Sequence, residues 1–399
     1  MSSSHSPLSG YRVLDLTNVL SGPFCCQQLA AMGAEVIKIE LPGSGDLARQ
    51  LGADTALSRA GNGVSFLAQN AGKQSVTINL KKIKGKDLLR KMVAQSDVLV
   101  ENFRPGVMDK LGLGYDILKQ TNPDLIYCAI SGFGQTGPLK DLPAYDQIIQ
   151  GMSGVMSITG NDMSAPLRVG YPVADTVGGL TAAFAVSAAL ARKGGERGCM
   201  IDVSMLESTL TTMGWVISNY LTAQQHPKPM GNDNFTASPS GTFETGKGLL
   251  NIAANKQDQF VALCEVLGRK DLIEDPRFCD RHMRLKYRAE LKSLIEQSLV
   301  EKDAEQWQDI LVAAGVPAGC VLTVPEILAH QQIRERDLIL SFESTGKTLH
   351  SVKPGFLVDG TRPSTDTPPP ELSQHTNSVL SALGLSGAEI RQLHKEDVI

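Results

Sequence analysis

Short apolar strand patterns alternate with helical patterns through the first third of the chain. Residues 13–17 (VLDLT) and 35–40 (EVIKIE) read as strands, and between them Pro23 and Gly33 are typical of the start and the end of a helix. A strand, a helix and a second strand form a βαβ unit, whose strands are parallel. The sequence therefore predicts an α/β fold with a parallel sheet covered on both faces, and ligands at the carboxyl ends of its strands. The same alternation recurs at residues 75–80, 84–95, 97–103 and 124–134.

A change of composition indicates a second domain. A chain of 399 residues exceeds what one hydrophobic core usually organises, so we expect two domains. After a helix at 180–192, a strand at 199–205 and a long helix to about residue 224, the stretch 224–241 is rich in proline, asparagine, serine and glycine. Such a stretch is a linker or a functional loop. Beyond it we expect a smaller α/β domain with a strand at 248–254, helices at 258–267, 285–300 and 303–314, and a strand at 318–323.

The charges and the cysteines limit the classes of partner. The chain has 42 acidic and 38 basic residues, a net charge of -4 and no long block of one sign, which argues against nucleic acid or an anionic membrane. Its apolar runs are interrupted before the roughly 18 residues of a membrane span, and residues 1–9 hold no secretory signal, so we expect a cytoplasmic protein. The seven cysteines lack C-x-x-C spacing, which favours reduced thiols over disulfides and indicates no metal site.

One carboxylate stands in an otherwise apolar or small segment, residues 168–180 (RVGYPVADTVGGL). Asp175 comes shortly before a Gly-Gly pair, and two roles are open for it. As a helix cap it would accept backbone N–H bonds at the start of the following helix. As a reagent it would be kept ionised by the positive end of that helix. Histidine is absent between His5 and His226, so this part of the chain has no imidazole to act as a general base.

Four further segments carry polar groups at strand ends. Residues 19–23 (VLSGP) join a strand to a helix start, where backbone N–H groups meet a phosphate or an acyl carbonyl, or simply form a turn. Residues 100–112 hold amide, aromatic and cationic side chains that either bind a ligand or are solvated. The loop 131–147 closes over a ligand or connects two elements, and Asp146 in it can stabilise the first turn of the next helix. Residues 70–82 place three lysines around a strand.

Taken together, these segments resemble the family III coenzyme A transferases, the CaiB/BaiF group of carnitine and formyl-CoA transferases. The resemblance runs from about Tyr11 to Ile399 and rests on the order and spacing of short motifs. These are VLDLT...GP, GAEVIKIE.PGSGD, VENFRPG, SGFGQTGP...AYD, R.GYP..D..GG, DPRF, AGVPAG and PPPEL..HT..VL..LG. The family implies a large Rossmann-like domain that binds CoA, residues 1–225 together with 325–399, a small α/β domain of residues 226–324, and an interlocked ring homodimer.

The resemblance makes Asp175 the catalytic residue of a CoA-transferase. A carboxylate with an ordinary pKa near ~4 is ionised at neutral pH and attacks a thioester without a base, which accounts for the missing histidine. The implied route passes through an acyl-aspartyl anhydride and an aspartyl-CoA thioester. We expect backbone N–H groups of the turn 19–22 and the loop 238–241 to stabilise the oxyanions. The CoA thioester is a substrate, and neither a tightly bound cofactor nor a metal is implied.

The same resemblance assigns a set of side chains to CoA. Leu41 stands where relatives often have a basic residue near the nucleotide, and Leu20 replaces the glutamine of formyl-CoA transferases. The tetraglycine loop of those enzymes is absent around residues 236–241, so oxalate is less expected as an acceptor. Ser373 replaces a glycine in the tail, which affects only a local turn. The residues implied to bind CoA are Leu20, Ser21, Ile78, Lys81, Asn102, Phe103, Arg104, Lys110, Lys140 and Tyr145.

Two other functions stay open on the sequence alone. An α-methylacyl-CoA racemase shares the fold but needs two acid–base groups, and the histidine that such enzymes carry beside the loop aspartate is Tyr145 here. A non-catalytic CoA-binding protein would keep the site without needing Asp175. For a transferase, the resemblance favours succinyl-CoA as donor and a small dicarboxylic acid as acceptor. The distal carboxylate of that acid needs a cation, for which Arg49, Lys140 and Arg168 are candidates.

Overall fold

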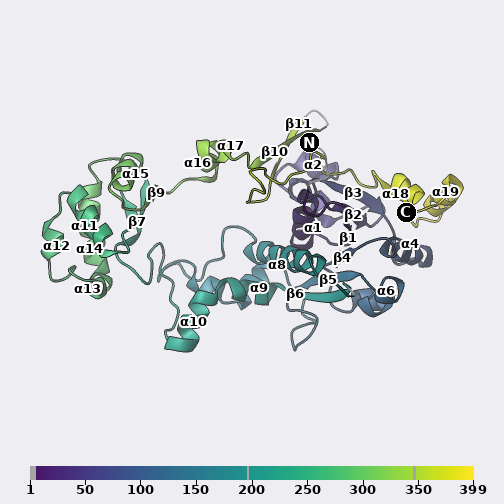
Figure 1. Cartoon of the computed structure of the whole chain (residues 1–399), viewed down its shortest axis with the longest axis horizontal. Coiled ribbons are helices and arrows are strands. Elements are labelled where there is room, and N and C mark those ends of the chain that lie inside the picture. The colour runs from purple at the N-terminus through teal and green to yellow at the C-terminus, as the bar shows by residue number, and fades with distance from the viewer. Residues whose placement is uncertain (1–5, 196, 345–346) are drawn as a thin grey trace. The chain divides into compact units, whose positions relative to one another are not determined.

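The chain divides into two compact units, each with its own sheet and core (Figure 1). The structure is a computed structural model that describes residues 6–195, 197–344 and 347–399. The smaller unit is not one continuous stretch, because a short segment that precedes Arg168 in the chain belongs to it. The larger unit combines the residues up to Val155 with Arg168–His226 and Arg334–Ile399, and the smaller unit combines Met156–Leu167 with Pro227–Ile333.

Six parallel strands form the sheet of the larger unit, in the order β3-β2-β1-β4-β5-β6. The chain first adds strands on one side of β1 and then returns to place β4 on its other side, so the strand order reverses between β1 and β4. Open α/β sheets bind ligands in the crevice at such a reversal. The parallel α/β fold predicted from the sequence is confirmed. The strands are β1 (Arg12–Asp15), β2 (Glu35–Glu40), β3 (Lys73–Thr77), β4 (Val98–Glu101), β5 (Ile126–Ser131) and β6 (Cys199–Ser204).

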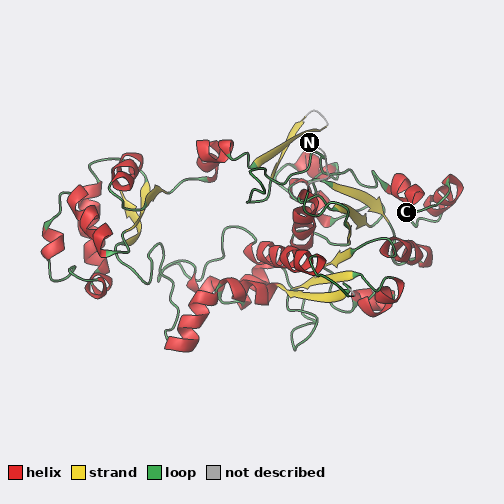
Figure 2. Cartoon of the chain, in the orientation of Figure 1, coloured by secondary structure: helices red, strands yellow, loops and turns green. Residues whose placement is uncertain are grey.

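Helices cover both faces of this sheet, so its central strands are apolar on both sides (Figure 2). Successive residues of β1 show the alternation, because Val13 lies in one core cluster and Leu14 in the other. On the Val13 side, α1 (Ser21–Ala31) and α8 (Val173–Leu190) complete the core. The Leu14 side is covered by α4 (Ile83–Val93), α6 (Tyr115–Thr121), α18 (Thr376–Ala382) and α19 (Gly387–Lys395).

α8 begins earlier than the sequence pattern predicts. The pattern indicates a helix over 180–192, whereas α8 starts at Val173, so Asp175 lies in its first turn. The Gly-Gly pair is inside the helix and lets α1 come close, since a Cβ on Gly179 would lie 2.5 Å from the carbonyl oxygen of Ser21. By length and composition α8 is the one helix of the described residues that could cross a membrane. In the larger unit it packs against α1 and the sheet as a core helix does.

The stretch after β6 forms two helices instead of the single long helix expected. α9 (Met205–Thr212) ends and α10 (Gly214–Ala223) begins on either side of Met213. Glycine is a weak helix former in an interior, so Gly214 favours a break at this position. The sequence pattern registered the apolar periodicity of both helices and missed the interruption.

The C-terminal arm returns to the larger unit and pairs with β3 at the edge of the sheet. The N–H of Thr77 donates to Thr376 Oγ1 at 3.0 Å, and the N–H of Ser373 donates to Ser75 Oγ at 3.0 Å. Ser373 has a φ of 66°, the left-handed region that favours glycine, which is the residue expected from the family pattern. The arm also adds buried side chains to the core beside Leu14, namely Leu380, Ile390, Leu393, Val398 and Ile399.

The smaller unit is built on a three-stranded antiparallel sheet, in the order β7-β8-β9. Its core includes Phe243, Leu250, Phe260 and Trp307. The three amphipathic helices predicted from the sequence are present as α11, α14 and α15. The elements are β7 (Ser240–Glu244), β8 (Leu249–Ala253), α11 (Gln257–Val266), α12 (Asp271–Glu274), α13 (Arg281–Lys286), α14 (Arg288–Leu299), α15 (Ala304–Ala313), β9 (Ala318–Cys320), α16 (Val324–Ala329) and α17 (Gln331–Glu335).

The remaining elements are short and lie in the connections of the larger unit. They are α2 (Thr55–Arg59), α3 (Val64–Leu67), α5 (Val107–Leu111), α7 (Asp146–Met152) and the hairpin of β10 (Ile339–Ser344) and β11 (Lys347–Val352). Among the described residues, 3₁₀ helices cover Leu47–Gln50 and Val155–Ile158, and the second begins at the last residue before the segment Met156–Leu167 of the smaller unit. Of these elements, α7 matters most for the site, because it begins at Asp146.

Candidate active site

A cavity of about 240 Å³ lies at the carboxyl ends of the central strands in the larger unit. It is lined by residues that end or follow β1, β4 and β5, by the loop of residues 140–145, and by Asp175 and Met205. The segments after β1 and β4 leave the sheet where the strand order reverses. The cavity is therefore at the place where the sheet topology predicts ligand binding.

Most side chains that the family resemblance assigns to CoA line this cavity together with Asp175. Three of the assigned residues do not. Ile78 is buried in the core cluster of Leu14, and Lys81 and Lys110 are exposed side chains outside the lining. The cavity thus brings together seven of the ten assigned residues, which are Leu20, Ser21, Asn102, Phe103, Arg104, Lys140 and Tyr145.

Asp175 is a largely buried carboxylate with a raised pKa. Burial raises its pKa to about 7, and the nearby carboxylate of Asp146 acts in the same direction. The expectation of an ordinary pKa for this carboxylate is wrong, because loss of hydration and the like charge of Asp146 both raise it. Near neutral pH, more of this carboxyl group is therefore protonated than of an ordinary aspartate.

The cap of α8 is supplied by Asp146. Its Oδ1 accepts the N–H of Ala174 at 2.9 Å and that of Asp175 at 3.4 Å, and the guanidinium of Arg168 lies 3.7 Å from its Oδ2. The alternative role of Asp175 as a cap is wrong. The sequence interpretation assigned Asp146 to the first turn of its own helix, because nothing local in the sequence indicates that its side chain reaches α8.

The turn between β1 and α1 forms another part of the wall. Val19 has a φ of 67°, which a β-branched residue rarely adopts. Asn102 clamps the turn from β4, since its side chain accepts the N–H of Asn18 and donates to the carbonyl of Asn18, both at 2.8 Å. Within the described residues, the N–H groups of Leu20 and Ser21 have no acceptor, and Ser21 Oγ is buried without a partner. The start of α1 thus offers free donors to a ligand.

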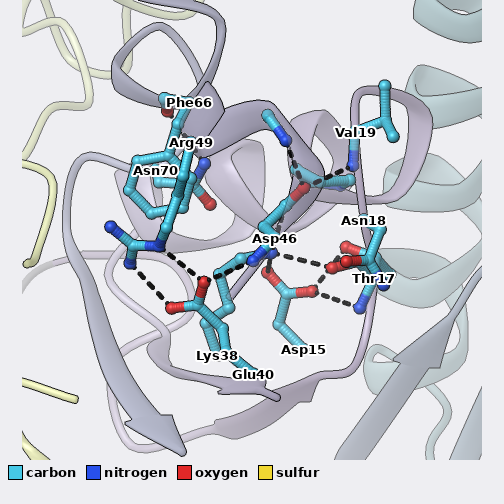
Figure 3. Close-up of polar contacts among 12 residues, drawn as sticks. Asp15, Thr17, Asn18, Val19, Lys38, Glu40, Asp46, Arg49, Phe66 and Asn70 are labelled. Carbon is cyan, nitrogen blue, oxygen red and sulfur yellow. Dashed lines mark hydrogen bonds and ion pairs between the residues drawn. The ribbon is translucent and has the colours of Figure 1, made fainter. Parts of the chain in front are cut away.

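A buried cluster of charged side chains supports this turn (Figure 3). Lys38 Nζ lies 2.9 Å from Asp46 Oδ2 and donates to the carbonyl oxygen of Thr17 at 2.8 Å. Asp46 Oδ1 accepts the N–H of Val19 at 2.9 Å. Burial alone would lower the pKa of Lys38, but the carboxylates of Asp15 and Asp46 raise it above its usual value. The lysine therefore stays charged in the interior.

Arg49 belongs to the same buried cluster. Its guanidinium donates to both carboxylate oxygens of Glu40 at 2.7 Å and stacks on Phe66, 3.7 Å from the ring centre. The side chain is 1% exposed, so Arg49 is unavailable to a substrate and its candidate role as partner of a distal carboxylate is wrong. Lys140 lines the cavity and Arg168 is 48% exposed, so both remain candidates.

Glu101 is a second buried acid beside the cavity. It ends β4 directly before Asn102, and its Oε2 accepts the N–H of Phe103 at 2.7 Å. Burial raises its pKa to about 7. Nothing in the local sequence marks Glu101 as a site residue, because a carboxylate at a strand end is typical of a solvated residue. Any pH dependence near neutrality therefore has two candidate groups, Asp175 and Glu101.

Comparisons with known proteins give one consistent result. The model of CoA-transferase family III matches residues 8–376. The chain is 36% identical over 386 residues to the succinate–glutarate CoA-transferase of Agrobacterium fabrum, covering 94% of this chain and 96% of that protein. It is 39% identical over 336 residues to the acetyl-CoA:oxalate CoA-transferase of Acetobacter aceti, covering 84% and 85%. A crystal structure of a CAIB/BAIF family protein from Brucella suis superposes with a TM-score of 0.82 at 33% identity, covering 95% of this chain and 99% of that one.

Proposed function

The chain belongs to CoA-transferase family III, and from this premise we propose that it moves coenzyme A from succinyl-CoA to a small dicarboxylic acid. The observation that carries the proposal is a cavity lined by Asp175 and by Leu20 and Ser21, whose backbone N–H groups have no acceptor among the described residues. A nucleophile and oxyanion donors in one cavity are what acyl transfer through a covalent intermediate requires.

In the first step, the ionised carboxylate of Asp175 attacks the carbonyl carbon of the donor thioester. The carbon–sulfur bond breaks, CoA leaves as a thiolate, and the acyl group remains on Asp175 as a mixed anhydride. Negative charge develops on the carbonyl oxygen during the attack. We assign the stabilisation of this charge to the N–H groups of Leu20 and Ser21, two cavity-lining residues at the positive end of α1.

The later steps return CoA to a new acid. The thiolate attacks the Asp175 carbonyl of the anhydride, which releases the donor acid as a carboxylate and leaves an aspartyl-CoA thioester. The carboxylate of the acceptor attacks this thioester, which forms a second anhydride and frees the thiolate again. The thiolate then attacks the acceptor carbonyl, and the products are a new acyl-CoA and the carboxylate of Asp175. No base is consumed, in keeping with a site without histidine.

The names of the relatives support dicarboxylic substrates. They also indicate which donors and acceptors to include in the assay. One relative is named for succinate and glutarate and another for acetyl-CoA and oxalate, so both donors and both kinds of acceptor belong in the assay. We expect succinyl-CoA with glutarate or a similar dicarboxylate to react fastest and oxalate to react slowly. Transfer restricted to monocarboxylic or carnitine-like acceptors would refute the assignment. Exchange of the proton at carbon 2 of a 2-methylacyl-CoA without any transfer would favour a racemase instead.

Exposed apolar side chains of the larger unit support the expected homodimer. Phe184 and Leu180 on α8 are 75% and 49% exposed, and Trp215 and Leu221 on α10 are 61% and 66% exposed. Large side chains gathered on two helices in this way are typical of a surface that a partner covers. Light scattering should give about twice the mass of one chain, and a monomer in solution would contradict the interlocked homodimer.

Trapping the covalent intermediate tests the mechanism directly. The protein is incubated with succinyl-CoA and hydroxylamine and then analysed by peptide mass spectrometry, which should place the modification on Asp175. Asp175→Ala should lose both the modification and the transfer. Asp116→Asn, on the surface in a pair with Lys119, is the matched control and should keep both. Transfer of CoA by the Asp175→Ala variant would show that the mechanism is wrong.

A further inference from the structure

We propose that the buried Lys38–Asp46 pair positions the oxyanion-binding part of the active site by holding a strained turn, residues 17–20. The inference rests on the proposed function, because that function gives the turn its catalytic use. Among the described residues, the lining of the cavity includes neither Lys38 nor Asp46. They are therefore positioning residues, which act through the backbone that they bind.

The strained turn has a backbone conformation that its own side chains disfavour. Val19 has a φ of 67°, and a valine in this left-handed region is costly because its branched Cβ crowds the backbone. Strain of this kind persists only where the surrounding structure over-determines it, and it gathers at functional sites. In the described part of the chain, the other non-glycine residues with positive φ all carry polar side chains, and they are Gln224, Asp337, Asp359, Ser373 and Asp397.

Four side chains from different parts of the chain hold the strained turn, and three of them, Asp15, Lys38 and Asp46, are labelled in Figure 3. Asp15, at the end of β1, accepts the N–H of Thr17 at 2.9 Å. Lys38, from β2, donates to the carbonyl oxygen of Thr17, and Asp46 accepts the N–H of Val19. Asn102 binds both the N–H and the carbonyl of the residue between them. Every residue from 17 to 19 is thus fixed by at least one side-chain contact, and the ion pair joins two of these contacts into one unit.

Burying the Lys38–Asp46 pair costs free energy, because both charges lose their hydration. Lys38 and Asp46 are 0% and 1% exposed, and the loss of hydration of two charges is offset only by excellent geometry. Apolar side chains of similar volume often give equal or greater stability at such positions. A pair whose two members each bond to the backbone of one turn instead fixes that turn, which apolar side chains cannot do. Its contribution is the position of the turn rather than net stability.

The residues that follow Val19 connect this position to the chemistry. Leu20 and Ser21 begin α1 and line the cavity with Asp175. Ser21 is 3% exposed, and its Oγ has no partner, so a ligand atom is the natural acceptor for it. Rotation of the Val19 peptide would turn the next N–H groups away from the developing oxyanion. The expected consequence is a lower kcat, with a smaller change in the KM for acyl-CoA.

The test compares variants of the pair in the full chain, with succinyl-CoA and glutarate as substrates. Asp46→Ala and Lys38→Met should each lower kcat by about 100-fold and change the KM for succinyl-CoA by less than about threefold. Asp46→Asn keeps an oxygen that accepts the N–H of Val19 and should recover most of kcat. The double variant Lys38→Met/Asp46→Ala should have a kcat only slightly below that of the less active single variant, because both residues act through one turn.

Arg362→Met is the matched control, because it removes another buried cation of the larger unit. Arg362 donates to the carbonyl oxygens of Arg336 and Pro354 in the C-terminal arm, away from the cavity lining. Its kcat should equal that of the wild type. A folded Asp46→Ala variant with kcat within about twofold of wild type, or an equal loss in the control, overturns the proposal.

Amide hydrogen exchange supplies a readout that does not depend on activity. The peptide that contains residues 17–22 should exchange faster in Lys38→Met than in the wild type, in Asp46→Asn or in Arg362→Met. This measurement keeps the proposal testable if Asp46→Ala fails to fold, and unchanged exchange overturns it. A wild-type protein without any transfer would refute the proposed function instead, while faster exchange would still show that the pair holds the turn.

Discussion

The buried carboxylates near the starts of α1 and α8, the two helices that begin at the cavity, differ in how their charge is compensated. At α1, the buried carboxylate of Asp46 lies 2.9 Å from the buried ammonium of Lys38. At α8, the charge of Asp146 acts on the nearby Asp175, and the guanidinium of Arg168, 3.7 Å from Asp146, is half exposed. The compensated side holds a backbone in place, whereas the uncompensated side holds a carboxylate whose proton is easily gained or lost. The cavity wall thus has a rigid part at the start of α1 and a reactive carboxylate at the start of α8.

The largest expected effect comes from breaking another ion pair of the buried cluster on the compensated side, Arg49–Glu40. Arg49→Met removes the cation that holds the pKa of the buried Glu40 below its usual range against the effect of burial. The uncompensated charge should cost about 3–5 kcal/mol of unfolding free energy, measured by urea denaturation. The surface variant Lys119→Met should leave the midpoint nearly unchanged. An Arg49→Met protein as stable as the wild type would show that the cluster is not a structural core.

The uncompensated side should respond in the opposite direction. Asp175 has its pKa raised to about 7 by burial, so the folded state holds a proton that the unfolded state has already lost between about pH 4 and 7. Stability therefore falls as pH rises through this window. Asp175→Asn removes this cost and should raise the unfolding free energy by about 2 kcal/mol at pH 8, with a difference that shrinks toward pH 4. A variant less stable than the wild type at pH 8 would contradict the assignment.

A cation that lines the cavity should affect substrate binding, whereas the buried cations affect folding. Lys140 lines the cavity and is exposed. Lys140→Met should raise the KM for a dicarboxylate acceptor about tenfold, leave the KM for a monocarboxylate acceptor unchanged, and leave the melting temperature unchanged. Steady-state kinetics with a matched pair of acceptors makes the comparison. Equal changes for both acceptors would assign Lys140 to CoA instead, and no change would leave Arg168 as the cation.

The smallest effect should be a shift in the pH profile. Asp146→Asn keeps the oxygen that caps α8 but removes the charge that helps to raise the pKa of Asp175. The acid limb of kcat/KM should therefore move to lower pH, with activity at pH 8 changed by no more than a few fold. Glu101→Gln serves as the control, because its own pKa is also about 7. If that variant moves the limb and Asp146→Asn does not, the titrating group is Glu101.

The sheet was predictable because its signal is local. β2 was predicted at its observed bounds, since a run of apolar residues between turn signals needs no long-range information. The start of α8 was harder to predict, because its first turn contains Asp175 and follows a proline, and both interrupt the apolar periodicity of the helix. The helix pair α9 and α10 was missed for a related reason, since both share one period across the break at Met213.

The chemistry of the site depended more on contacts between distant residues. Asp175 was identified from its unusual surroundings and from the family pattern, but its raised pKa depends on burial and on Asp146, which comes from another helix. The left-handed conformation of Val19 cannot be predicted from the local sequence, because valine is typical of extended strands and not of left-handed positions. Arg49 was offered as a substrate-binding cation because its buried partner Glu40 comes from a separate strand.

The packing of the C-terminal arm has a consequence for the order in which the protein is made. Leu380, Ile390 and Leu393 complete a core that Leu14 and Ile37 begin, so the part of this sheet face that α4 and α6 do not cover stays exposed until the last helices leave the ribosome. The bulk of the smaller unit is encoded in one continuous stretch, Pro227–Ile333, which emerges earlier. Until those helices emerge, the nascent chain would therefore carry a partly exposed apolar sheet face, the kind of surface that chaperones protect from aggregation.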